Sequence, residues 1–104
     1  LLATSPQITN CYFANYWLSA ILIEPNKAKG IDREALRLAF EAANIESRPL
    51  WKPMHLQPIF EQYPYYGSNV AETLFEKGLC LPSGSNLTDE ERVRIKKVVF
   101  DFFK

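Results

Sequence analysis

The chain has 104 residues, of which 47% are hydrophobic and 23% charged, a composition typical of one ordinary globular domain. Its 12 Lys and Arg residues balance 12 Asp and Glu residues, which argues against non-specific binding to nucleic acid or to an anionic membrane. The longest apolar run, residues 16–23, is too short to span a bilayer. We therefore expect neither nucleic acid nor a membrane as a partner.

The cysteines point to a protein of the cytoplasm. Cys11 and Cys80 form no CxxC pair, and the single histidine cannot complete a Cys/His zinc site, so no metal site is predicted. We expect both thiols to be reduced and buried. Leu1 has neither an initiator Met nor a basic leader around it, from which we expect a fragment of a longer protein.

The first part of the chain predicts a lead-in segment followed by one domain. Residues 1–13 show no hydrophobic period and are interpreted as a lead-in or linker, with the domain covering residues 14–104. Residues 16–23 are aromatic, β-branched and almost continuously apolar, which predicts the most buried strand of a sheet.

A helix is predicted over residues 32–43, with Asp32 as its N-cap. Its apolar positions form a single stripe at helical spacing: Leu36, Ala39, Phe40 and Ala43. A short second strand is expected within residues 45–50, where Pro49 limits its length.

Residues 49–66 are predicted to form a loop, because prolines at this density exclude a long helix or a central strand. One short helical turn is expected near residues 56–62. If a larger domain has been removed, this loop should expose apolar area through its aromatic residues, namely Trp51, Phe60, Tyr63, Tyr65 and Tyr66.

Two further helices and one strand complete the pattern. A helix over residues 69–77 is expected to be capped by Ser68 or Asn69, with Glu72 as the capping-box partner of Asn69, and to end at a left-handed Gly78. A strand follows at residues 79–81, and then a helix over residues 88–103 whose Thr88 and Glu91 form another capping box. The order of elements predicts a two-layer α/β (α+β) fold, a small sheet with helices packed on it.

Candidate chemistry gathers in residues 48–58, because no glycine-rich phosphate loop and no GxSxG motif is present. The cations of Arg48 and Lys52 suit a phosphate, Trp51 suits a base or sugar, and His55 suits a hydroxyl. The alternative is that the apolar members of the segment fill the core and its polar groups are solvated.

The run RPLWKPMHLQP at residues 48–58 resembles a signature of the DegT/StrS family of sugar-nucleotide aminotransferases. Three other stretches agree in order and spacing: NYWLS at residues 15–19, VAETLFEKGLCLPSG at residues 70–84, and LTDEE at residues 87–91. The resemblance covers nearly the whole chain from Asn15 onward.

The resemblance implies the small C-terminal domain of a homodimeric fold-type I enzyme that uses pyridoxal phosphate. Such an enzyme moves an amino group, usually from glutamate, to a nucleotide-linked keto-sugar, for polysaccharide, glycan or related amino-sugar biosynthesis. The Schiff-base lysine would belong to the large domain, so no catalytic residue is assigned to this chain, and the isolated chain is expected to be inactive and to bind no cofactor covalently. By analogy, the loop with His55, Trp51, Lys52 and Met54 lies at the nucleotide-sugar, with His55 as the foremost contact.

Two other functions remain open at the level of sequence. Some members of the same family act as sugar dehydratases, and the residue that decides between the two reactions lies outside this chain. A free-standing α/β ligand-binding or interaction module without catalysis is the alternative from another class. Neither the sugar nor the nucleotide follows from these residues.

Overall fold

The computed structural model describes residues 2–3 and 15–104, which form a small antiparallel sheet with helices. The sheet has four strands in the order β1-β2-β4-β3. Its strands are β1 (Leu2–Ala3), β2 (Ser19–Leu22), β3 (Arg48–Pro49) and β4 (Gly78–Leu81). The helices are α1 (Arg33–Ala42), α2 (Val70–Lys77) and α3 (Asp89–Phe102), with a 3₁₀ turn at Met54–Leu56.

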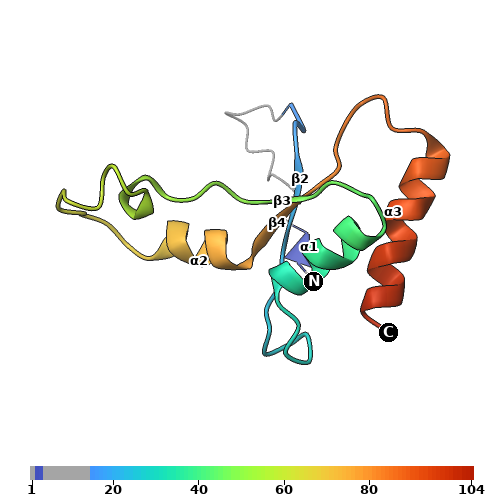
Figure 1. Ribbon diagram of the computed structural model, residues 1–104, viewed down its shortest axis with the longest axis horizontal. Helices are drawn as coiled ribbons and strands as arrows, with labels where there is room; N and C mark the ends of the chain where they lie inside the picture. Colours follow the sequence, from blue (N-terminus) through green and yellow to red (C-terminus); the bar gives the residue numbers. More distant parts are fainter. Residues whose placement is uncertain (1, 4–14) are drawn as a thin grey trace, which may run out of the picture.

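One face of the sheet carries the core. Ile21 and Leu79 are directly opposite each other in the β2–β4 register, and both are buried against Leu36 and Phe40 of α1. Helix α3 adds the partly buried side chains of Ile95, Val98, Val99 and Phe102 to this cluster. Helices α1 and α3 lie together beside the sheet (Figure 1). The predicted two-layer α/β fold is therefore confirmed.

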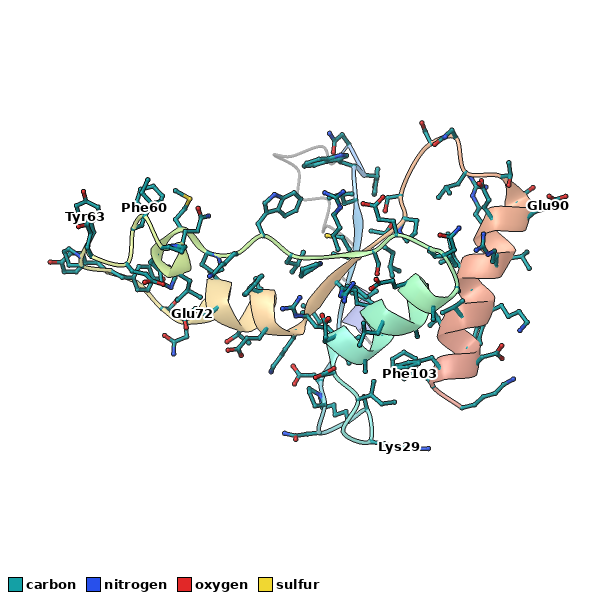
Figure 2. The ribbon with its side chains drawn as sticks, viewed as in Figure 1. Lys29, Phe60, Tyr63, Glu72, Glu90 and Phe103 are labelled. Carbon is teal, nitrogen blue, oxygen red and sulfur yellow. The ribbon has the colours of Figure 1, made fainter. Side chains whose placement is uncertain are left out.

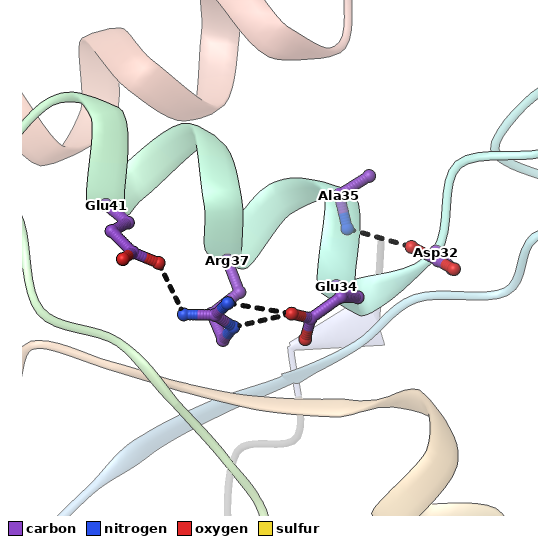
Figure 3. A network of polar contacts seen from close by, with 5 residues as sticks. All are labelled: Asp32, Glu34, Ala35, Arg37 and Glu41. Atoms are coloured by element: carbon purple, nitrogen blue, oxygen red, sulfur yellow. Dashed lines mark hydrogen bonds and ion pairs between the residues drawn. The ribbon is translucent and has the colours of Figure 1, made fainter.

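Helix α1 forms as its sequence predicts. The Asp32 carboxylate accepts a hydrogen bond from the backbone N–H of Ala35 at 2.8 Å, which satisfies one of the free donors of the first turn. On the exposed side, Arg37 donates to Glu34 at 2.9 Å and to Glu41 at 2.7 Å (Figure 3). This bridge raises the pKa of the guanidinium and lowers that of the Glu34 carboxyl, but exposed pairs of this kind contribute little stability.

Helix α3 begins with the predicted capping box. The Thr88 hydroxyl accepts from the Glu91 backbone N–H at 3.2 Å, and the Glu91 carboxylate accepts from the Thr88 backbone N–H at 2.7 Å. These two reciprocal hydrogen bonds fix the start of the helix. The apolar stripe of α3 packs against the core of α1 and the sheet.

The prediction for residues 16–23 is wrong in two respects. The strand begins only at Ser19, because Tyr16 adopts a left-handed φ of 53° and turns the chain out of the sheet. Residues 16–18 are consequently exposed, with Trp17 at 67%. The most buried strand is β4 instead. It pairs with β2 along one edge and with β3 along the other, and Leu79 on one of its faces belongs to the core.

The junction of α2 and β4 also differs from its prediction. The Asn69 side chain makes no capping hydrogen bond, and Glu72 turns away to His55. Gly78 is extended, with φ −90° and ψ 138°, so the helix passes into the strand without a left-handed cap. A Cβ at Gly78 would overlap the Leu50 side chain and would lie 2.5 Å from the Leu74 carbonyl oxygen, so close approach explains the glycine.

The remaining expectations concern the first residues, β3 and the cysteines. Leu2 and Ala3, within the expected lead-in, pair with β2, whereas residues 1 and 4–13 lie outside the described residues. The predicted 45–50 strand is reduced to β3, an edge strand where a proline is tolerated, and the helical turn lies slightly earlier than predicted. Cys80 is buried and free, and burial raises the pKa of its thiol, while Cys11 lies outside the described residues.

The capping box predicts a pH-dependent contribution to stability. Hydrogen bonds from Thr88 lower the pKa of Glu91 from its ordinary value of 4.5. A carboxyl whose pKa is lower in the folded than in the unfolded state stabilises the fold at pH values above its unfolded-state pKa. This contribution is lost as the pH falls through the folded-state pKa. We expect urea unfolding midpoints of wild type and Glu91→Gln to differ at neutral pH and to converge in acid below 4.5. A constant difference across this range would contradict the account.

Candidate functional site

Residues 50–69 and α2 together form an arm that leaves the sheet on the side away from α3 (Figure 1). The arm lengthens the molecule to 47 Å along its longest axis. The radius of gyration is 15.7 Å, whereas a compact domain of this length has about 13 Å. The molecule is therefore more extended than a compact domain of its length.

The arm presents aromatic and apolar side chains to solvent. Tyr66 is 89% exposed and Trp51 is 66% exposed, while Tyr63, Tyr65 and Ile59 are also exposed. Phe60 is half-buried, so the prediction of an exposed aromatic loop is confirmed for every member except this one. Figure 2 shows Phe60 and Tyr63 on the loop near the end of the arm.

Within the arm, His55 joins the loop to α2. Its Nε2 lies 2.7 Å from a carboxylate oxygen of Glu72, and the two side chains are only 15% and 33% exposed. The imidazole stacks on Tyr65 with ring centroids 3.6 Å apart and planes at 15°. Tyr65 in turn donates through its hydroxyl to the Ser68 carbonyl at 2.8 Å. We call His55, Tyr65 and Glu72 the clasp.

The lack of a side chain at Gly67 makes room for the clasp. A Cβ on this residue would lie 2.6 Å from the Tyr65 hydroxyl oxygen and 2.8 Å from its ring. A side chain at position 67 would therefore require the Tyr65 ring to shift from its place in the clasp.

Besides the clasp, the structure has a hollow where the arm meets the sheet. This hollow has a volume of about 590 Å³ and is lined by the segments around Trp17, Arg48 and Trp51 and by the end of β4. The rings of Trp17 and Trp51 lie with centroids 5.7 Å apart and planes tilted by 43°. The Ser47 hydroxyl beside them is buried and has no hydrogen-bond partner among the described residues.

The structure divides the five predicted site residues between these two places. Arg48 and Trp51 line the hollow, whereas Met54 and His55 belong to the arm. The Arg48 side chain is 79% exposed and forms an ion pair with Glu46. Lys52 lies on the arm with an exposed side chain, and its carbonyl accepts from the Gln57 side-chain amide at 3.3 Å.

Sequence analysis missed three residues of these surfaces. Trp17 was assigned to the interior of a strand, and nothing in the sequence places it beside Trp51. Glu72 was assigned to a helix cap, which is the usual role of a Glu three residues after Asn. Tyr65 was recognised only as one of several exposed aromatic residues. A pattern of spacing along the chain cannot reveal contacts that depend on the loop folding back on α2.

The described residues do not fit pyridoxal phosphate. The cofactor requires a lysine that can form a Schiff base and a set of donors for its phosphate. Among residues 2–3 and 15–104, no polar or charged residue is buried as a whole, and only single polar atoms of Arg33 and Ser47 are buried without a partner. Lys77 pairs with Glu24 at 2.9 Å, and a hydrogen bond to Asp101 raises the pKa of Lys97, so neither is prepared as a nucleophile.

Neither a cluster of metal-ligating side chains nor a helix that could cross a membrane is found in the part of the chain that the structure describes. No three His, Cys, Asp or Glu side chains in this part gather closely enough to hold a metal ion. Nor does any helix in it have the length and apolarity needed to cross a bilayer.

Comparison with known proteins identifies relatives along most of the chain. The model of the DegT/DnrJ/EryC1/StrS aminotransferase family matches residues 2–100. A Bacillus subtilis protein, EpsN, provisionally named a pyridoxal phosphate-dependent aminotransferase, is 37% identical over 94 residues, covering 86% of this chain and 23% of EpsN. GDP-perosamine synthase of Escherichia coli is 31% identical, covering 88% of this chain and 24% of the enzyme.

A solved structure shows the same fold. The crystal structure of a DegT DnrJ EryC1 StrS aminotransferase from Brucella abortus superposes with a TM-score of 0.74 at 24% identity. The match covers 97% of this chain and 26% of that structure. The chain thus spans only about a quarter of the length of the relatives that it matches.

The exposure of the arm predicts where a protease will cut the isolated chain. We expect chymotrypsin to cleave first after Tyr66, the most exposed aromatic residue, since Pro64 protects the bond after Tyr63. Mass spectrometry of the early fragments identifies the bond. First cuts in α3 or in the sheet would show that the arm is covered in the isolated chain.

Proposed function

The chain belongs to the DegT/DnrJ/EryC1/StrS aminotransferase family, and we propose that it is the small C-terminal domain of a pyridoxal phosphate-dependent sugar aminotransferase. The observation that carries the proposal is a family match across residues 2–100 by a chain that covers only 23% of EpsN. We propose glutamate as the amino donor and a nucleotide-linked keto-sugar as the acceptor. The enzyme would be a cytoplasmic homodimer.

The cofactor belongs to the rest of the enzyme in this proposal. Pyridoxal phosphate, when bound, supplies the electron sink for amino transfer. Because the described residues offer neither a suitable lysine nor a phosphate cradle, we assign both to the large domain. The chain described here contributes surfaces to the substrate cleft.

We propose that the hollow and the arm provide those surfaces. The exposed cations of Arg48 and Lys52 suit the diphosphate of a nucleotide-sugar, and the open face of Trp51 suits a sugar or base ring. Met54 and His55 continue the same loop toward the end of the arm. Domains that close over a substrate exclude water from it, which is a general means of favouring transfer over hydrolysis.

The test uses the full-length protein that contains this chain. We expect it to bind pyridoxal phosphate as an aldimine and to transfer an amino group from glutamate to a nucleotide-linked keto-sugar, followed by mass spectrometry. The isolated chain should do neither. Lys77→Arg serves as the matched control and should leave the aldimine intact, because Lys77 is engaged with Glu24.

Other outcomes of this experiment identify the alternatives. Loss of water from the sugar without amino transfer would show a dehydratase of the same family. Binding of a nucleotide-sugar with no reaction would show a non-catalytic module. An aldimine formed by the isolated chain and abolished by a single lysine substitution within it would contradict the proposal that the cofactor lysine belongs to the large domain.

A further inference from the structure

The pairing of His55 with Glu72 constrains which imidazole nitrogen carries the proton. A carboxylate accepts hydrogen bonds but cannot donate one. Since Nε2 lies 2.7 Å from the Glu72 oxygen, Nε2 must be the nitrogen that carries hydrogen. In the neutral imidazole, Nδ1 is then an acceptor.

The ring is also held in place. One face of the imidazole stacks on Tyr65 at a centroid distance of 3.6 Å, which fixes the plane of the ring, and the bond to Glu72 fixes its rotation. Among residues 2–3 and 15–104, none donates a hydrogen bond to Nδ1. The clasp therefore presents one oriented acceptor that the described residues do not use.

We propose that Glu72 is a positioning residue that holds His55 with Nδ1 ready to accept a hydrogen bond from a hydroxyl of the sugar. This inference rests on the proposed function. A hydroxyl is the fitting partner because it carries a proton to donate, whereas an ionised phosphate oxygen has none. In the neutral ring, the pairing of Nε2 with Glu72 leaves Nδ1 to accept from the hydroxyl rather than to donate to it.

Glu72 is well placed for this role. It lies in the first turn of α2, where the positive end of the helix dipole favours a carboxylate. It is freed from capping, because Asn69 makes no side-chain bond to the helix. Helix α2 itself continues into β4, so Glu72 is tied to the most buried strand of the fold.

Glutamine and asparagine at position 55 separate the two roles of the histidine in the full-length protein. The amide nitrogen of glutamine can replace Nε2 and donate to Glu72, but glutamine has no atom in place of Nδ1. Asparagine places an oxygen near Nδ1 but loses the bond to Glu72. The variants are His55→Gln, His55→Asn and Glu72→Ala, with Glu76→Ala as the control one helical turn further on, where the side chain is exposed.

We expect Glu72→Ala and His55→Gln each to raise the KM for the nucleotide-sugar about five- to tenfold, the effect of losing one hydrogen bond. The half-reaction with the amino donor should change less than about twofold in both, because the donor need not meet this part of the cleft. His55→Gln should lower the melting temperature less than His55→Asn does, because both lose the ring that stacks on Tyr65 but only glutamine keeps the bond to Glu72. The double variant of Glu72→Ala and His55→Gln should be no worse than His55→Gln alone. Glu76→Ala should match wild type throughout.

Three results would overturn the proposal. Wild-type KM in His55→Gln would show that Nδ1 is not used and that the histidine only fastens the arm. Wild-type KM in Glu72→Ala would show that Glu72 positions nothing. Equal losses in both half-reactions, following the melting temperature, would show a purely structural role. If instead wild type transfers no amino group to any nucleotide-linked keto-sugar, the proposed function fails, and the melting temperatures still report whether the clasp exists.

Discussion

The direct passage of α2 into β4 at Gly78 is the constraint on which the rest of the molecule depends. With no Cβ at this position, the Leu50 side chain and the Leu74 carbonyl can approach the backbone. The Leu50 backbone N–H also donates to the Gly78 carbonyl at 3.3 Å, and the Ile23 N–H donates to the Lys77 carbonyl at 2.9 Å. The arm has two limbs, the loop that begins at Leu50 and helix α2. Both are thus joined to β4, the most buried strand, at Gly78.

This attachment explains how a small domain can hold an arm away from its core. An isolated loop with this many exposed rings would gain little by staying extended, since none of the described residues buries these rings. The clasp joins the two limbs at a distance from the sheet, and the Gly78 junction joins them at their base. Between these two points of attachment lie Trp51, Lys52 and Met54.

The sequence predicted those parts of the fold that depend on neighbours along the chain. The Asp32 cap, the Thr88–Glu91 box and the stripes of α1 and α3 follow from spacing, and the structure confirms them. Features that depend on distant partners were missed. Glu72 contacts His55 instead of capping its helix, because this tertiary contact outweighs the local preference. The left-handed backbone of Tyr16 follows from no pattern in the sequence. The candidate site was predicted as one segment, whereas Arg48 and Trp51 line the hollow and His55 belongs to the clasp.

The most direct test of this account is hydrogen–deuterium exchange of residues 50–69 in the full-length protein and in the isolated chain. If the arm is a docking and substrate surface of a larger enzyme, its amides should exchange rapidly in the isolated chain and be strongly protected in the full-length protein, with further protection when a nucleotide-sugar binds. The sheet and α3 should exchange alike in both. Equal exchange of the arm in the two proteins, unaffected by the nucleotide-sugar, would contradict the central claim that the arm is built to meet the rest of the enzyme and its substrate.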